Sequence, residues 1–338
     1  MGKILVTGAT GYIGSHTCVA LMRAGYRVLA VDNLSRSKVA SLARIQMITG
    51  IAPRFYNVDV CDEEEMNWIF RDHLIDCVIH FAGLKDVEES VRQPLDYYHN
   101  NVYGLLQLLH VMQRNRCKSL VFSSSATVYG AGETAPYKED MKTSAVNPYG
   151  QTKLMGEQIL RDLCATDPEW SVAALRYFNP IGAHESGLLG EDPSGVPGNL
   201  VPCIARAATG QTQALSVYGS DYDTPDGTGI RDYIHVMDVA EGHIAALREY
   251  TARHRGFRTF NLGTGKGSSV LEVVAAYEAA CGKKIPLSME ARRSGDVAVS
   301  YADVTRAREE LNWTASADLE RMCADSWRFV CQNPRGLE

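Results

Sequence analysis

Short apolar runs alternate with stretches of helical periodicity through the first half of the chain. Six runs have the length and composition of strands: Lys3–Thr7, Arg27–Val31, Arg54–Val58, Asp76–Phe81, Ser119–Ser123 and Val172–Phe178. Between them, helical stretches include Ile13–Ala24, Glu63–His73, Asn100–Asn115 and Gly150–Ala165. Strands that alternate with helices predict βαβ units and therefore a parallel sheet with helices on both faces.

The pattern changes after about residue 179. Segments rich in Gly, Pro and Asp, Gly187–Gly198 and Gly219–Gly229, are predicted as long loops around a helix at Val201–Thr209. Arg258–Gly263 is predicted as a further strand and Ser269–Cys281 as a helix. We therefore predict an α/β protein with a Rossmann-type doubly wound parallel sheet and a smaller C-terminal substrate-binding lobe. The expected division assigns residues 1–178, with return segments near 232–263, to a dinucleotide-binding domain, and residues 179–231 and 264–338 to the lobe.

Composition narrows the class of protein. Hydrophobic residues make up 45% and charged residues 22%, and the net charge of -6 argues against nucleic acid as the main partner. The nine cysteines are scattered, and neither they nor the nine histidines show metal-ligand spacing, so we expect no metal and a reducing compartment. The N-terminal residues do not resemble a signal peptide, and no apolar run approaches the roughly 20 residues that span a bilayer. We expect a cytoplasmic protein with no membrane partner.

A GxxGxxG run at Gly8–Gly14 lies between the first predicted strand and the first predicted helix. A tight turn that approaches a pyrophosphate excludes side chains, and a helix N-terminus offers free N–H groups. Asp32 ends the second strand about 20 residues later, where a carboxylate accepts from the adenosine ribose and repels a 2′-phosphate. The pattern predicts NAD rather than NADP, although Arg36 and Lys38 are cations that could accommodate a phosphate. Asp59 is either an adenine partner or an ordinary loop-start Asp.

Tyr149 and Lys153 stand four residues apart in a segment of helical periodicity. That spacing places both side chains on one face of a helix. A free phenol has a pKa near 10, too high for a base at neutral pH. A neighbouring ammonium and a positively charged nicotinamide would lower that pKa, so Tyr149 is a candidate acid–base group. The same helix is expected to bury a stripe formed by Leu154, Met155, Ile159 and Leu163.

A run of serines, Ser123–Ser125, lies at the carboxyl end of the fifth predicted strand. A hydroxyl there can bridge a reacting oxygen and the phenolate, and Ser125 is the favoured candidate. Serine also caps helices and forms turns, so such a local role is the competing interpretation. His235 is expected to be a structural histidine rather than a catalyst.

These segments resemble the extended short-chain dehydrogenase/reductase family. The resemblance is carried by Gly8–Gly14, Asp32–Leu34, His80–Lys85, Ser123–Gly130, Asn147–Gly150 and Leu175–Pro180. Further segments resemble the UDP-hexose 4-epimerases of that family: Gly182–His184, Gly190–Asp192, Asp226–Val236 and Asn261–Gly263. The likeness extends over essentially the whole chain.

The resemblance implies reversible 4-epimerisation of UDP-glucose and UDP-galactose through a 4-keto intermediate, with tightly bound NAD. It implies a homodimer that packs Asn100–Asn115 and Gly150–Ala165 against their mates. The implied catalytic residues are Ser125, Tyr149 and Lys153. The implied cofactor site comprises Gly8, Gly11, Tyr12, Ile13, Gly14, Asp32, Asn33, Leu34, Ser35, Arg36, Ser37, Asp59, Val60, Phe81, Ala82, Gly83, Leu84, Lys85, Asn100, Ser125, Tyr149, Lys153, Tyr177 and Phe178. The implied UDP-sugar site comprises Lys85, Ser125, Tyr149, Phe178, Asn179, Asn199, Leu200, Leu215, Ser216, Val217, Tyr218, Arg231, Arg293, Asp296 and Ser300.

Two positions depart from the family pattern. Asp86–Glu89 adds charge near the cofactor where the family usually carries small residues, and the sequence offers no explanation. Ser300 stands where some relatives carry a tyrosine that restricts the sugar pocket. A serine leaves room beside the sugar C2 substituent, which predicts that UDP-N-acetylhexosamines are also accepted.

Three other functions share much of this pattern. A nucleotide-sugar 4,6-dehydratase typically has acidic residues after the catalytic serine or threonine, where this chain has Ala126-Thr127. A dehydrogenase with exchangeable cofactor would differ in releasing its NAD. A non-catalytic dinucleotide sensor would have no need of Ser125, Tyr149 and Lys153 together.

Overall fold

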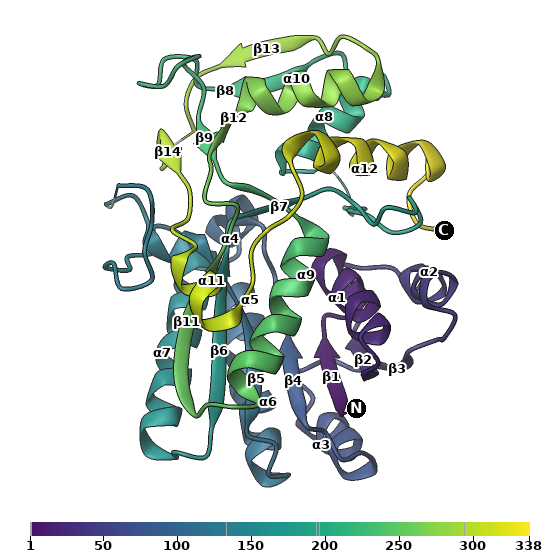
Figure 1. Cartoon of the computed structure of the whole chain (residues 1–338), viewed down its shortest axis with the longest axis vertical. Helices are drawn as coiled ribbons and strands as arrows, with labels where there is room; N and C mark the ends of the chain where they lie inside the picture. The colour runs from purple at the N-terminus through teal and green to yellow at the C-terminus, as the bar shows by residue number, and fades with distance from the viewer. Residues whose placement is uncertain (1, 133, 194, 196, 294) are drawn as a thin grey trace.

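A computed structural model describes residues 2–132, 134–193, 195, 197–293 and 295–338. Seven parallel strands form the central sheet in the order β11-β6-β5-β4-β1-β2-β3 (Figure 1). The strands are β1 (Lys3–Thr7), β2 (Arg27–Asp32), β3 (Arg54–Asn57), β4 (Cys77–His80), β5 (Ser119–Ser125), β6 (Ser171–Tyr177) and β11 (Gly256–Leu262). The predicted Rossmann-type sheet is confirmed, and its strand ends differ from the predicted ends by at most two residues.

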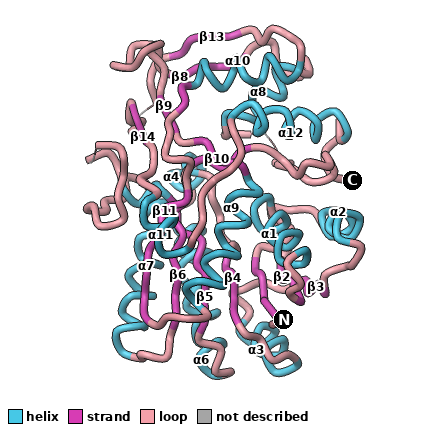
Figure 2. The backbone as a smooth tube through the Cα atoms, in the orientation of Figure 1, coloured by secondary structure: helices cyan, strands magenta, loops and turns pink. Residues whose placement is uncertain are grey.

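Helices cover both faces of this sheet (Figures 1 and 2). Side chains alternate along a strand, so Ile4 and Val6 of β1 belong to one hydrophobic cluster and Leu5 to the other. The first cluster is closed by α1 (Tyr12–Arg23), α2 (Ala40–Thr49) and α9 (Val236–Ala245). The second is closed by α3 (Glu63–Asp72), α6 (Gly104–Arg114) and α7 (Pro148–Thr166).

Shorter helical segments precede α6. They are α4 (Val87–Arg92), α5 (Pro94–Tyr97) and a π-helical turn, η1 (Tyr98–Tyr103). The predicted helix Asn100–Asn115 is therefore the end of a longer helical run. The 3-10 turn η2 (Ala126–Tyr129) follows β5, and the π-helical turn η3 (Ala246–Thr251) extends α9.

The smaller lobe lies beyond the carboxyl ends of the sheet strands (Figure 1). Its helices α8, α10 and α12 pack around a separate hydrophobic cluster that includes Ile204, Val273, Tyr277 and Met322. The remaining elements are β7 (Asn179–Ile181), α8 (Leu200–Ala208), β8 (Leu215–Tyr218), β9 (Ile230–Arg231), β10 (Tyr233–His235), β12 (Ser268–Ser269), α10 (Val270–Cys281), β13 (Leu287–Glu290), β14 (Val299–Ser300), α11 (Thr305–Leu311) and α12 (Leu319–Gln332). The loop predicted at Gly187–Gly198 includes residues 194 and 196, which lie outside the described residues.

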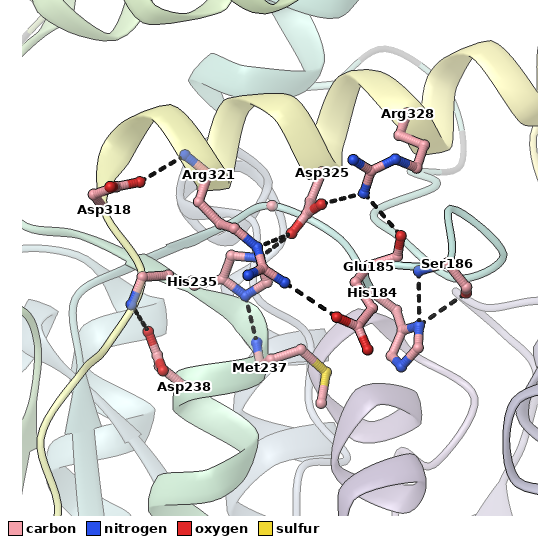
Figure 3. Close-up of polar contacts among 12 residues, drawn as sticks. His184, Glu185, Ser186, His235, Met237, Asp238, Asp318, Arg321, Asp325 and Arg328 are labelled. Carbon is pink, nitrogen blue, oxygen red and sulfur yellow. Dashed lines mark hydrogen bonds and ion pairs between the residues drawn. The ribbon is translucent and has the colours of Figure 1, made fainter.

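A buried carboxylate joins α12 to β10 and α9 (Figure 3). Asp325 accepts a hydrogen bond of 2.9 Å from Arg321 Nε, pairs with Arg328, and lies 3.3 Å from His235 Nε2. The other ring nitrogen of His235 accepts from the backbone N–H of Met237 at the start of α9. These contacts give His235 the structural role that the sequence predicts.

No helix in the part of the chain that the structure describes is both long and apolar enough to cross a membrane.

Candidate active site

The glycine turn between β1 and α1 allows very close backbone approach. A Cβ on Gly14 would lie 2.1 Å from the carbonyl oxygen of Gly8, and a Cβ on Gly8 would lie 2.7 Å from the backbone nitrogen of Ala82. Gly8 also has a φ of 66°, which favours glycine. Gly11 is the N-cap of α1 and provides no side-chain cap, so the first N–H groups of the helix are open to an anion.

Asp32 organises the loop that follows β2. Its carboxylate accepts hydrogen bonds from the backbone N–H groups of Thr10, at 3.1 Å, and Leu34, at 2.9 Å. The Ser37 hydroxyl donates a third, at 3.0 Å. Leu34 has a φ of 59°, an unusual value for leucine, and the hydrogen bond of its N–H to Asp32 stabilises this turn. The predicted ribose partner thus also holds the predicted cofactor loop in shape.

Asp59 lies two residues after the end of β3. It accepts from the side chain of Asn33 and from the backbone N–H of Cys61, both at 2.8 Å. The contact with Cys61 is the loop-start role, and the contact with Asn33 ties the loop after β3 to the loop after β2. The adenine contact stays a prediction.

The acidic stretch at Asp86–Glu89 has a structural explanation. Asp86 caps α4 by accepting from the N–H of Glu89, and the Glu89 carboxylate lies 2.6 Å from the Arg36 guanidinium. Glu89 also accepts from the Tyr97 hydroxyl at 2.9 Å. The Arg36 contact lowers the pKa of Glu89, which therefore stays anionic. Arg36, one of the two cations that could accommodate a 2′-phosphate, is paired with a carboxylate.

The second such cation is paired as well. Lys38 lies 2.8 Å from Asp192. Both basic side chains after β2 are thus engaged by carboxylates from other segments, which agrees with the preference for NAD inferred from Asp32.

Tyr149 lies in the first turn of α7, beside the carboxyl end of β5. Asn147 caps this helix by accepting from the N–H of Gly150 at 2.8 Å, and Pro148 occupies the first helical position. The helix therefore begins two residues before the predicted start. Ser125 ends β5 and accepts from the N–H of Thr127, so it performs the local capping role considered above. Ser125 also makes a side-chain hydrogen bond with the phenol of Tyr149; this bond lowers the pKa of Tyr149, whereas burial, the larger effect, raises it.

Lys153 reaches the same strand end. Its Nζ donates a hydrogen bond of 2.7 Å to the carbonyl oxygen of Ser123 and lies 5.9 Å from the centre of the Tyr149 ring. Burial lowers the pKa of Lys153 to about 8. Burial also raises the pKa of Tyr149. The lowering of the phenol pKa by Lys153 together with a bound nicotinamide stays a prediction.

The buried face of α7 differs from the predicted stripe. Met155 is exposed, and Leu154, Ile159 and Leu163 are only partly buried at the edges of the clusters. The buried positions of α7 are Gly150, Thr152, Lys153, Gly156, Glu157, Leu160 and Cys164. The helix thus points a mostly polar face at the strand ends, which hydrophobic periodicity does not predict.

Asn101 is a residue that the sequence interpretation did not single out, next to the predicted Asn100. The Asn101 side chain is buried, and it accepts from the N–H of Leu84 at 2.8 Å and donates to the Leu84 carbonyl at 2.9 Å. It also donates to the Thr152 hydroxyl at 3.0 Å. Asn101 therefore fixes the predicted cofactor loop to α7. The signal in the sequence is its place beside the predicted Asn100.

The other predicted residues around the cofactor site lie at the carboxyl ends of the sheet strands. Tyr177 ends β6 and bonds the hydroxyl of Ser123, and Phe178 is buried beside Tyr129 and Tyr137. Tyr12 and Ile13 lie in the first turn of α1; Asn33, Leu34, Ser35 and Ser37 follow β2; Val60 follows β3; Phe81, Ala82, Gly83, Leu84 and Lys85 follow β4; Asn100 lies in η1; and Asn179 begins β7.

In the lobe, five predicted UDP-sugar residues are linked by contacts and strand pairing. Arg231 lies 3.7 Å from Asp296, whose N–H donates to the carbonyl of Arg293. The Arg293 guanidinium stacks 3.9 Å from the centre of the Tyr218 ring, so it is not a freely solvated charge. Ser300 pairs with Arg231 across β14 and β9. The structure therefore brings together residues separated by up to about eighty positions in sequence.

The side chains of the predicted substrate strand β8 alternate between the lobe core and the surface. Leu215 and Val217 point into the hydrophobic cluster of the lobe, with exposures of 3% and 1%, whereas Ser216 and Tyr218 are exposed. Side chains alternate along a strand, so only every second residue can face a ligand. Leu215 and Val217 can offer backbone groups only.

Glu191 links the two halves of the site, although no role was predicted for it. One of its oxygens accepts from Asn199 at 2.8 Å and from Lys85 at 3.1 Å. Asn199 precedes Leu200 at the start of α8 and makes no side-chain cap, so the N–H groups of that helix are open to an anion. Glu191 thus joins the loop after β4 to the start of α8.

Among the residues that the structure describes, no group of three or more His, Cys, Asp and Glu side chains is arranged to hold a metal ion.

Comparison with known proteins decides the family. Residues 4–263 match the model of the NAD dependent epimerase/dehydratase family. The chain belongs to this family. Its relatives include the UDP-glucose 4-epimerase of Bacillus subtilis (strain 168), 55% identical over 335 residues, which cover 99% of this chain and 98% of the relative.

Solved structures of this family share the whole fold. UDP-glucose 4-epimerase from Bifidobacterium longum in complex with NAD+ and UDP has a TM-score of 0.95 at 50% identity, with 99% of each chain covered. The enzyme from Stenotrophomonas maltophila with bound NAD and formylated UDP-arabinopyranose has a TM-score of 0.97 at 48% identity, again with 99% of each chain covered.

Proposed function

We propose that this chain is an isomerase that interconverts UDP-glucose and UDP-galactose by epimerisation at C4, with tightly bound NAD. The observation that carries the proposal is the convergence of Ser125, Tyr149 and Lys153 at the carboxyl end of β5. In open α/β sheets, ligands bind at that edge. The similarity to UDP-glucose 4-epimerases over nearly the full length supports the same activity.

The residues around the glycine turn fit a dinucleotide. Side chains at Gly8 and Gly14 would collide with backbone, while the uncapped start of α1 offers N–H groups to a pyrophosphate. Asp32 at the end of β2 suits the adenosine ribose, and Lys153 suits the nicotinamide ribose. NAD bound here would accept the hydride from sugar C4 and return it.

Proton transfer is the task of the chain itself. Tyr149 takes the proton of the sugar 4-hydroxyl, and Ser125 can bridge the phenol and the reacting oxygen. The resulting 4-keto sugar turns about its link to the diphosphate and presents its other face. Tyr149 then returns the proton to the oxygen, and the configuration at C4 is inverted.

Residues of the lobe hold the part of the substrate that does not react. The guanidinium groups of Arg231 and Arg293 suit the bidentate geometry of a diphosphate, and Asp296 suits a ribose diol. The open start of α8 after Asn199 adds N–H donors. Anchoring UDP in this way leaves the hexose free to rotate, because binding energy is kept remote from the reacting carbon.

The test is to incubate the purified protein with UDP-galactose without added NAD and to separate the nucleotide sugars. We expect UDP-glucose to form until equilibrium, and NAD to stay with the protein through gel filtration. A product lighter by one water would instead indicate a 4,6-dehydratase, and turnover only with added NAD would indicate an ordinary dehydrogenase. No turnover by protein that retains NAD would indicate a sensor.

UDP-N-acetylhexosamines are a second proposed substrate pair. Ser300 lies in β14 directly beside Arg231, and its small side chain is half-buried. If the lobe holds UDP through Arg231, a serine at the neighbouring position leaves space for a larger substituent at sugar C2.

We also propose that the active form is a cytoplasmic homodimer. Apolar side chains are exposed on the two segments that the family resemblance places at the interface: Tyr103, Leu106 and Met155. Val91 of α4 and Leu95 of α5, in the helical segments that precede them, are exposed as well. A self-complementary apolar surface of this kind favours a symmetric dimer. Light scattering after gel filtration measures the mass, and we expect Leu106→Glu to shift it from dimer to monomer. The nine free cysteines suit a reducing compartment.

A further inference from the structure

A buried acid lies directly beneath the proposed catalytic residues and is not used in the mechanism above. Glu157 is four residues after Lys153 and eight after Tyr149 on α7, so the three side chains follow one face of the helix. Glu157 is only 1% exposed. A charged side chain is rarely buried to this degree unless its partners are fixed.

The partners of Glu157 come from the two strands that α7 covers. Its Oε1 accepts from the Ser124 hydroxyl at 2.6 Å and from Arg176 Nε at 2.8 Å. Its Oε2 accepts from an Arg176 terminal nitrogen at 2.6 Å. Ser124 and Arg176 are themselves paired in register across β5 and β6. One carboxylate therefore bonds the helix to both strands at a single point.

Ser124 lies between the two residues of β5 that contact Lys153 and Tyr149. Ser124 is flanked by Ser123, whose carbonyl accepts from Lys153, and by Ser125, which hydrogen-bonds the Tyr149 phenol. The strand therefore supplies three consecutive residues to three residues of one helix face. Any slip of α7 along β5 would change all three contacts together.

Arg176, the partner of Glu157, makes further hydrogen bonds. Arg176 donates to the Tyr129 hydroxyl and to the Glu139 carbonyl, both at 3.1 Å. Tyr129 in turn donates to the Asn261 side chain at 2.6 Å. A fully bonded buried set of this kind is rigid, because every member is costly to leave unpaired.

We propose that Glu157 is a positioning residue for the epimerase reaction: its bond to Ser124 sets the register of α7 on β5 and so aligns Tyr149 with Ser125. This inference rests on the proposed function. Displacements of about 1 Å in a catalytic group can cost on the order of 100-fold in rate. The effect should therefore appear in turnover rather than in substrate binding.

The test uses two variants and a matched control. Glu157→Gln keeps the size of the side chain but removes the charge opposite Arg176, and Ser124→Ala removes only the bond to the strand. Asp325→Asn is the control, because Asp325 is also a buried carboxylate paired with arginines but lies on α12 in the lobe (Figure 3). Each protein is assayed for kcat, KM, the pH dependence of kcat, bound NAD and Tm.

We expect Glu157→Gln to lower kcat by about 10–100-fold with KM changed less than about threefold and NAD retained. Ser124→Ala should lower kcat by about 3–10-fold with a smaller change in Tm. Because the Ser125 hydrogen bond lowers the phenol pKa, its loss should move the limb of the pH profile that belongs to the phenol to higher pH in both variants. Asp325→Asn should lower Tm with kcat within about twofold of the unchanged protein.

The inference is overturned if Glu157→Gln has a lower Tm, as Asp325→Asn does, but an unchanged kcat and pH profile. If Glu157→Gln does not fold, Ser124→Ala decides, and an unchanged kcat and pH profile for that variant overturns the inference. An unchanged protein without epimerase activity would overturn the proposed function instead, so the two failures are distinguishable.

Discussion

Lys153 donates a hydrogen bond of 2.7 Å to the backbone carbonyl of Ser123, and this contact ties the fourth residue after Tyr149 to the strand that ends in Ser125. The acid–base unit is thus assembled from one helix face and one strand end. Neither α7 nor β5 alone contains the whole acid–base unit. The position of the phenol depends on how α7 lies against β5.

Removing the phenol hydroxyl tests the acid–base role. We expect Tyr149→Phe to lower kcat by about 10²–10⁴-fold, because the 4-hydroxyl loses its proton acceptor. The assay is UDP-glucose formation from UDP-galactose. The variant should keep its bound NAD and a Tm close to that of the unchanged protein, and a near-normal rate would refute the role.

Glu89 is expected to influence the choice of cofactor. Its carboxylate pairs with Arg36 at 2.6 Å, so Glu89→Gln frees a cation near the adenosine end of the predicted site. We expect the ratio of bound NADP to bound NAD to rise about tenfold, the effect of one additional charge-assisted hydrogen bond of ~1.4 kcal/mol. The protein is renatured with equal amounts of both cofactors, and the bound cofactor is identified by mass spectrometry. Glu88→Gln is the matched control, since Glu88 is an exposed neighbour, and equal ratios in the two variants would contradict the prediction.

The close contact inside the glycine turn predicts that one added methyl group lowers the free energy of unfolding substantially. In Gly14→Ala the new Cβ would lie 2.1 Å from the Gly8 carbonyl oxygen, and backbone on both sides must move. We expect a loss of at least about 2 kcal/mol in the free energy of unfolding together with loss of bound NAD. Urea unfolding and cofactor content are measured. Gly132→Ala, where a Cβ meets nothing within 4 Å, should change neither.

Buried histidines predict that stability falls on acidification. Burial lowers the pKa of His16 and His80 to about 3 and that of His243 to about 4. In the unfolded chain these rings take up protons near pH 6.5, whereas in the folded chain they do not. Their stabilisation is therefore complete above about pH 6.5 and is lost as the pH falls towards the folded pKa values.

Between pH 6.5 and 5 each of these histidines should cost about 2 kcal/mol of unfolding free energy. Urea unfolding across this range gives the slope. His80→Gln should reduce the loss over this range by about 2 kcal/mol, whereas His110→Gln, at an exposed position, serves as the control. A pH-independent free energy of unfolding in this window would refute the prediction.

Ser300→Tyr tests the proposed second substrate pair. A tyrosine beside Arg231 would fill the space left for the C2 substituent. We expect turnover of UDP-N-acetylgalactosamine to fall more than about tenfold, while turnover of UDP-galactose changes less than about threefold. Ser288→Tyr, on an exposed strand of the lobe, is the control. Absence of N-acetyl turnover in the unchanged protein would remove the proposal before the variant is needed.

The sheet could be predicted from the sequence because a parallel strand covered on both faces is apolar throughout, as in β4 and the middle of β5. The glycine turn and Asp32 could also be predicted from the sequence, since a pyrophosphate and a ribose impose local requirements on the chain. One local prediction failed, because Met155 is exposed although it continues an apolar pattern.

The sequence by itself determined the elements, the strand that carries each candidate group, and the spacing of Tyr149 and Lys153, because these follow from local periodicity and turn chemistry. Only the tertiary structure decided that Asn101 bonds Leu84, that Glu89 neutralises Arg36, and that Glu157 bonds Ser124. The reason is physical. Each of these pairings joins segments far apart in the chain, and a charge or amide is paired only when packing brings its partner within hydrogen-bond distance and excludes water from both.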